Sequence, residues 1–149
     1  MSREELERID DQGIAAWNDH DTDGWVGLLA DDFVIYDWTV ADPIRDKEGA
    51  RKYFDAWKTA FPDMEFRVDV LLEVDDLVVS HWTLTGTHSG GAYYDVPPSG
   101  ARVTINGTAI LRLRDGQVVE HWGGPHCMHG IGLARVVGPG PHAATATHP

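Results

Sequence analysis

Two kinds of side chain in this sequence could transfer protons, and examples of both fall in segments with a strand-like pattern. His81 lies in the middle of residues 79–83, and Asp37 lies late in residues 33–38. An unperturbed imidazole has a pKa of about 6.5, so it can accept and return a proton near neutral pH. A carboxylate does so only after burial raises its pKa. These residues therefore indicate general acid/base catalysis, which needs a base, an acid and donors to a developing oxyanion.

Each of these candidates also has an ordinary structural interpretation. Strand alternation puts His81 on the face of Val79 and Thr83, where it contacts either a ligand carbonyl in a pocket or a neighbouring strand. Asp37 either faces a pocket, where burial would raise its pKa, or is a loop carboxylate in water. Asn106, in the middle of an extended segment, either donates to a substrate oxygen or faces solvent.

Other catalytic signatures do not occur in the sequence. It contains no Gly-x-Ser-x-Gly elbow, phosphate-binding loop or dinucleotide fingerprint. The spacing of His121, His126, Cys127 and His129 matches no zinc pattern, so no metal site is expected. Cys127 is the single cysteine, which excludes an internal disulfide and fits a reducing compartment.

The candidate residues need secondary structure to hold them, and the hydrophobic pattern predicts three helices in the first part of the chain. The first follows a capping-box pattern that opens at Ser2, and it runs to about Asn18. A short second helix is expected after Thr22 as its N-cap. The third begins near Asp46 and ends before Pro62, because the residue before a proline avoids the helical region.

The pattern elsewhere is extended. The expected strands are residues 33–38, 64–73, 77–88, 101–114 and 117–124. Asp75-Asp76 and Asp115-Gly116 are the expected hairpin turns. Helices followed by antiparallel strands predict a single α+β domain over residues 1–137. Residues 138–149 have little apolar surface to bury, so a disordered tail is expected there.

Length and charge limit the classes of partner. The 149 residues suit one domain with one core, and the net charge of −12 disfavours binding to nucleic acid and to anionic membranes. No apolar run is long enough to cross a bilayer and residues 1–18 do not resemble a signal peptide, so a cytoplasmic location is expected. The expected partners are small neutral or apolar molecules, or a second copy of the chain.

Several short motifs occur together along the chain. They lie at residues 16–21, 28–33, 61–64, 86–88, 96–100 and 111–122. In this order the sequence resembles the SnoaL-like polyketide cyclases, a branch of the NTF2-like proteins, over residues 8–133. The resemblance implies a cone-shaped α+β barrel in which three N-terminal helices pack on a strongly curved, mostly antiparallel sheet around a deep apolar pocket.

The resemblance also implies a function. The founding activity of the family closes a polyketide ring by intramolecular aldol condensation, without a cofactor, in natural-product and antibiotic biosynthesis. Relatives isomerise, dehydrate, hydroxylate or open epoxides, so isomerase, dehydratase or hydrolase chemistry is one alternative, and a non-catalytic binding protein is another. The implied assembly is a homodimer, in which a second copy covers apolar side chains on the outside of the sheet.

The implied site includes an acid/base residue shortly after the tryptophan equivalent to Trp122. In the family this residue is often acidic, whereas this chain has no Asp or Glu after Glu120 and carries His126 four residues past Trp122. His126 is therefore the first candidate for the acid/base role, while the irregular segment before it leaves His121 and His129 open.

The remaining candidates share aromatic or polar side chains suited to a flat polycyclic ligand. The catalytic candidates are His126, Asp37 and His81, and the substrate-binding candidates are Trp38, Trp57, Met64, Tyr93, Tyr94, Asn106, His121 and Trp122. Most of the aromatic residues could equally be ordinary core, because aromatic side chains at helix or strand spacing usually are.

Overall fold

The structure is a computed structural model that describes residues 1–129 of the chain. Its helices are α1 (Arg3–Asn18), α2 (Thr22–Gly27) and α3 (Lys47–Ala60). Its strands are β1 (Leu29–Asp37), β2 (Glu65–Val74), β3 (Leu77–Thr87), β4 (Arg102–Arg114) and β5 (Gln117–His129). The expected tail at 138–149 lies outside the described residues.

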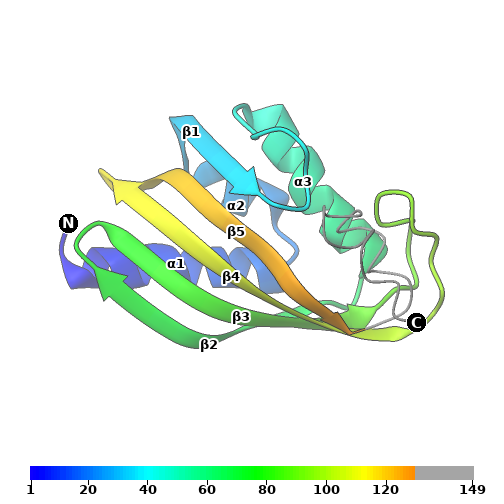
Figure 1. The fold of residues 1–149 in the computed structure, drawn as a ribbon. Helices are drawn as coiled ribbons and strands as arrows, with labels where there is room; N and C mark the ends of the chain where they lie inside the picture. Colours follow the sequence, from blue (N-terminus) through cyan, green and yellow to red (C-terminus); the bar gives the residue numbers. More distant parts are fainter. Residues whose placement is uncertain (130–149) are drawn as a thin grey trace, which may run out of the picture.

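The five strands form one sheet in the order β1-β5-β4-β3-β2. β1 pairs with β5 in parallel, and every other neighbouring pair is antiparallel. Figure 1 shows the sheet as a curved layer with the three helices on one side of it. Within residues 1–129 the two edge strands, β1 and β2, do not pair with each other, so the sheet is curved but not closed. The predicted α+β class, with helices on a mostly antiparallel sheet, is confirmed.

The predicted starts of α1 and α3 are confirmed. The Ser2 backbone N–H donates to the Glu5 carboxylate at 2.7 Å and the Ser2 side chain accepts from the Glu5 backbone, which completes the capping box. The Asp46 carboxylate accepts from the Gly49 backbone N–H at 2.6 Å at the start of α3. Each bond satisfies an N–H group that has no partner inside the helix.

The predicted start of α2 is wrong by one residue. Asp21 is the N-cap, and its carboxylate accepts from the Gly24 backbone N–H at 2.9 Å. The Thr22 hydroxyl instead donates to Asp55 of α3 at 2.6 Å, which ties the two helices together. An aspartate and a threonine side by side are both good caps, so the sequence pattern did not separate them.

Two strands are longer than expected. β1 begins at Leu29, which pairs with Val118 of β5, so the strand starts before residue 33. β5 continues past residue 124 because Gly123 and Gly124 remain paired with β4 despite positive φ angles of 149° and 136°. Both predicted hairpin turns are present: Asp75 has a φ of 56°, and the turn at residues 115–116 has φ angles of 52° and 76°.

Cross-strand register defines two rows of side chains that run over all five strands. We call them the inner row, which faces the helices, and the outer row, which faces away. From β1 to β2, the inner row is Ile35, His121, Leu111, Val78 and Glu73. In the same direction, the outer row is Tyr36, Trp122, Ile110, Val79 and Leu72. The rows are one residue apart on each strand, so they lie on opposite faces of the sheet.

The hydrophobic core fills the space between the helices and the inner face of the sheet. Its largest buried side chains include Phe54 and Trp57 of α3, Phe33 of β1 and Ile105 of β4. Among residues 1–129, no helix combines the length and the apolar character that crossing a membrane would need.

Candidate active site

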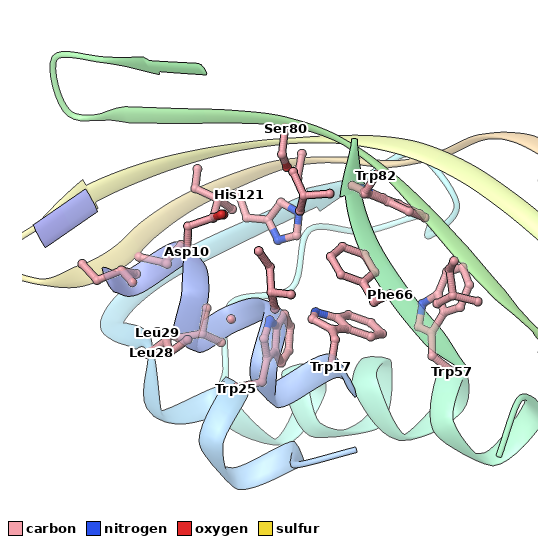
Figure 2. Close-up of a pocket in the computed structure, with 18 of the residues that line it drawn as sticks. Asp10, Trp17, Trp25, Leu28, Leu29, Trp57, Phe66, Ser80, Trp82 and His121 are labelled. Atoms are coloured by element: carbon pink, nitrogen blue, oxygen red, sulfur yellow. The ribbon is translucent and has the colours of Figure 1, made fainter. Parts of the chain in front are cut away.

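A cavity of about 90 Å³ lies between the helices and the inner face of the sheet (Figure 2). Its lining is mainly apolar, and all three helices and all five strands contribute residues. Trp17 of α1 stands at the centre of its aromatic wall, with ring centroids 5.9 Å from Trp25 and 5.7 Å from Phe66. Trp57 and Trp82 also line the cavity. Such a lining favours an apolar or aromatic ligand.

Three polar residues of this lining lie toward one end of the cavity. Figure 2 shows Asp10 of α1, Ser80 of β3 and His121 of β5 in this part, with the rings of Trp17, Phe66 and Trp57 toward the other. A site of this kind can hold an apolar body while its polar groups interact with a reacting carbonyl.

Asp10 is the most unusual group of the cavity. Its side chain is buried, with only 7% of the residue exposed, and its Oδ2 atom has no hydrogen-bond partner. Burial, followed by the negative charges of Asp11 and Glu73, raises the pKa of Asp10 to about 6. A carboxylic acid with this pKa can both release and regain a proton near neutral pH.

His121 faces the cavity from the inner row. Burial lowers its pKa to about 4, and the carboxylate of Asp37 opposes this only in part. The ring is therefore neutral at pH 7, with one nitrogen that donates a hydrogen bond and one that accepts. A neutral imidazole is a weak base, but its N–H can stabilise negative charge on a substrate oxygen.

Asp37 is buried beside the cavity and is fully hydrogen-bonded. Its Oδ2 accepts from the Tyr53 hydroxyl at 2.6 Å. Its Oδ1 accepts from both the backbone N–H and the hydroxyl of Thr39, at 2.7 and 2.5 Å. A Cβ on Gly124 would lie 2.7 Å from the same Oδ1, so only glycine lets β5 pass this close to the carboxylate. Asp37 is thus positioned as a structural anchor next to His121, rather than as a free carboxylate.

The structure places His81 and His126 together on the outer face, away from the cavity lining. Their ring centroids are 5.3 Å apart, and His81 Nδ1 lies 3.4 Å from Asp69 Oδ2. Thr83 also donates to Asp69, and Asn106 donates to Thr83 at 2.7 Å. This places three of the sequence candidates, His81, His126 and Asn106, outside the cavity. A catalytic role for His126 stays a prediction.

Strand geometry explains this placement. On β3, Ser80, Trp82 and Leu84 line the cavity, so His81 points the other way. On β5, His121 lines the cavity, whereas His126 lies at a bulge between the paired residues Pro125 and Cys127, with its ring beside that of His81. His121 therefore occupies the cavity position.

The aromatic candidates divide among cavity, core and surface. Trp57 lines the cavity, while Met64 and Tyr93 are buried in the core. Trp122 lies in the outer row, stacked on Tyr36 with ring centroids 6.0 Å apart. Trp38 and Tyr94 are exposed, and the Trp38 Nε1 donates to the Pro125 carbonyl at 2.5 Å. Of the substrate-binding candidates, Trp57 and His121 are the two that line the cavity.

Sequence reasoning missed Asp10, although a signal for it exists. Asp10 lies four residues after Leu6 and three before Gly13, within the apolar face of α1. An acidic residue inside an apolar helical face is either paired or functional, because burying a lone carboxylate is costly.

Among the described side chains, those of residues 1–126, no three of His, Cys, Asp or Glu come together in a geometry that could hold a metal ion.

Comparison with known proteins adds three findings. The sequence family described as SnoaL-like polyketide cyclase matches residues 7–128. AclR from Streptomyces galilaeus, a proposed hydroxylase, is 29% identical, with a TM-score of 0.76 and coverage of 94% of this chain and 85% of that chain. IdmH from Streptomyces antibioticus, a proposed polyketide cyclase, is 30% identical, with a TM-score of 0.67 and coverage of 78% and 88%.

A protein from Catenulispora acidiphila shares the fold alone. It is 14% identical, has a TM-score of 0.65 with coverage of 77% of this chain and 82% of that chain, and is described as having a ketosteroid isomerase-like fold. A search of curated protein sequences finds no significant match.

Proposed function

Since this chain belongs to the SnoaL-like polyketide cyclase family, we propose that it closes a ring of a polyketide-derived substrate by an intramolecular aldol-type condensation. The observation that carries this proposal is the apolar cavity with a neutral imidazole, His121, on its wall. IdmH, at 30% identity, is itself a proposed polyketide cyclase. Isomerisation and dehydration in the same cavity would begin with the same removal of a proton next to a carbonyl.

The cavity volume limits which part of the substrate it encloses. A volume of about 90 Å³ is somewhat below that of an engineered protein cavity that binds benzene, about 150 Å³. We infer that only the reacting edge of the substrate, with its carbonyl, enters the cavity, and that the rest of the substrate extends out of it. Trp17, Trp25 and Phe66 would then pack against the part that enters.

In the proposed reaction His121 stabilises the enolate oxygen. Removal of a proton next to a carbonyl puts negative charge on the carbonyl oxygen, and the N–H of a neutral imidazole can donate to it. Because burial keeps the pKa of His121 near 4, the ring does not need to lose a proton before it acts at neutral pH. Asp37, anchored by Tyr53 and Thr39, lies close enough to influence the charge of this ring.

We also propose that the protein is a homodimer that covers its outer row. This row is mainly apolar, and its end member Leu72 is 58% exposed. Val70 and Val74, which flank Leu72 on the same face of β2, are also exposed. A second copy related by a two-fold axis would bury these side chains against the same set of its own.

A compact ketone can test the proposed function before the natural substrate is known. Indan-2-one has one aromatic ring and activated C–H groups beside a carbonyl, so the exchange of these hydrogens in D₂O reports enolate formation. The protein should accelerate the exchange measured by ¹H NMR. His121→Phe should lower the rate about 10²-fold, the usual cost of one oxyanion donor, while binding measured by calorimetry changes little.

His126→Phe separates the two histidine assignments. If His121 acts in the cavity, His126→Phe should leave the exchange rate within about twofold, because His126 lies on the outer face. If His126→Phe abolishes exchange while His121→Phe does not, the assignment drawn from the family pattern is correct and the cavity assignment is wrong. A wild-type rate equal to that of buffer would contradict the enzymatic proposal and favour a binding protein.

A further inference from the structure

Asp10 is a carboxyl group in the cavity wall that no internal contact explains. Its Oδ2 is buried without a hydrogen-bond partner, and the residue as a whole is 7% exposed. Figure 2 shows it in the same part of the cavity as His121 and Ser80. A buried carboxylate in such surroundings loses its hydration and gains no hydrogen bond in return, so it lowers the stability of the fold. A ligand that donates a hydrogen bond or a proton to it would supply the missing partner.

The neighbouring charged groups that shift the pKa of Asp10 are both negative. Asp11 is its neighbour on α1, and Glu73, the β2 member of the inner row, adds a second negative charge. Arg3 lies beside Glu73, with its Nε 3.1 Å from Glu73 Oε2, but this Nε donates its hydrogen bond to Glu7 at 3.0 Å. His121, which shares the cavity, is neutral at pH 7 because burial lowers its pKa.

We propose that Asp10 is the acid/base residue of the ring closure, and that it takes the proton from the substrate carbon next to the carbonyl that His121 polarises. The inference rests on the proposed function, and it assigns the proton transfer to α1 rather than to the strand that carries His121 and His126.

Asp10 alone can both accept and return the proton that the reaction transfers. The Asp10 carboxylate removes the proton, and the electron pair of the broken C–H bond forms the enolate. The enolate carbon then attacks the second carbonyl of the substrate, which makes the new C–C bond and leaves an alkoxide. The carboxylic acid of Asp10 gives its proton to that alkoxide and returns to the carboxylate, so no cofactor or co-reactant is consumed.

The pH dependence expected for this role follows from the surroundings of Asp10. Burial, Asp11 and Glu73 together bring the pKa of Asp10 to about 6. The exchange rate should therefore rise as the pH passes this value and the carboxylate forms, and then level off. His121 would not add a step in this range, because its pKa is lowered to about 4.

The test compares Asp10→Asn with Asp11→Asn, using exchange of the indan-2-one hydrogens in D₂O as the readout. The two variants make the same chemical change on adjacent residues of α1, one buried and one exposed. Asp10→Asn should slow exchange by about 10²–10⁴-fold, lose the pH dependence near pH 6, and still bind indan-2-one by calorimetry. Asp11→Asn should keep the plateau rate at pH 7.5 within about twofold, while the pH midpoint moves slightly lower, because Asp11 helps to raise the pKa of Asp10. In Asp10→Ala, added formate should restore part of the exchange, because it can replace the missing carboxylate.

The outcomes separate this inference from the proposed function. If Asp10→Asn is folded by circular dichroism and keeps the wild-type rate while His121→Phe loses it, the assignment of Asp10 is wrong and the proposed function stands. If the wild type does not accelerate exchange, both fail. If Asp10→Asn does not fold, the formate response of Asp10→Ala decides: restored exchange supports the role, and no restoration overturns it.

Discussion

The inner and outer rows cross the same five strands one residue apart, yet they differ in their histidine and charged residues. The outer row carries no charged residue and ends in the exposed Leu72. The inner row faces the helices, where an apolar row would be expected, and it includes His121 and Glu73. The outer row thus has only apolar and aromatic side chains although it faces outward, whereas the inner row combines apolar residues with a histidine and a glutamate.

The difference indicates two separate tasks for the two faces. Polar groups inside a core lower stability unless they are paired or used, and His121 and Asp10 are two cavity groups of this kind. Elsewhere on the outer face, charged groups are paired: Arg112 Nε lies 2.8 Å from Glu120, and its Nη1 lies 3.0 Å from Asp76. We interpret the inner face as the ligand-binding side and the outer row as the assembly side.

The largest expected effect compares neighbouring residues of β3. Val78 belongs to the inner row and is fully buried, whereas Val79 belongs to the outer row. Val78→Asp should destabilise the fold by about 4 kcal/mol or more, because it buries an unpaired charge. Val79→Asp should leave the fold intact but break the proposed dimer. Chemical denaturation measures the first effect, and light scattering measures the second.

Light scattering also shows whether the comparison of the rows is correct. At micromolar concentration the wild type should have twice the 16.5 kDa mass of one chain, and Val79→Asp should have that mass once. A monomeric wild type, or a Val79→Asp variant that remains dimeric, would contradict the role given to the outer row.

A smaller loss of stability is expected when a hydrogen-bonded polar group of the interior, Asp37, is changed. Asp37 accepts three hydrogen bonds, from Tyr53 and twice from Thr39. Asp37→Asn replaces one acceptor oxygen by a donor, so it should cost about 1–3 kcal/mol in the free energy of unfolding. If the variant keeps its stability but loses α-hydrogen exchange, Asp37 is the catalytic base and not an anchor.

The smallest expected effect is a gain in the free energy of unfolding, whereas the substitutions above lower it. Since burial and neighbouring charges raise the pKa of Asp10 from 3.8 to about 6, the folded state binds this proton more tightly than the unfolded state does. The stabilisation from the protonated form is complete below pH ~4 and is lost as the pH rises through 6. Asp10→Asn has no such loss, so at pH 7.5 it should be more stable than the wild type by about 1–2 kcal/mol after allowance for solvent screening.

Melting curves across the pH range check this sign. The gain in Tm of Asp10→Asn should be a few degrees at pH 7.5 and should disappear near pH 4. A variant that melts lower than the wild type at pH 7.5 would show that the Asp10 carboxylate has a stabilising partner.

Local sequence signals were sufficient for most of the fold. Ser2 and Asp46 begin helices as capping residues, and the turn at residues 115–116 joins two long strands. Each of these signals depends on side chains within a few residues of one another, so it can be read without knowledge of the tertiary structure. The start of β1 could not be found in this way, because Leu29 becomes a strand residue through its pairing with the distant Val118.

The site was less accessible to sequence reasoning. Alternation correctly separated His81 from Ser80 and Trp82, but it could not show which of the two faces the helices would cover. Asp10 could have been noticed as an acidic residue in the apolar face of α1. That it borders a cavity depends on how three helices and the sheet fit together, which no single periodicity contains.

The aromatic wall of the cavity has an optical consequence. Four of the six tryptophans, Trp17, Trp25, Trp57 and Trp82, line the cavity, and the other two lie elsewhere. The indoles of Trp25 and Trp57 have ring centroids 5.9 and 6.2 Å from that of Trp17, so excitation energy can pass readily among them. A ligand that quenches one ring would therefore dim the neighbouring rings as well. The intrinsic fluorescence of the unlabelled protein would then report occupancy of the cavity, with the emission of Trp38 and Trp122 as a nearly constant background.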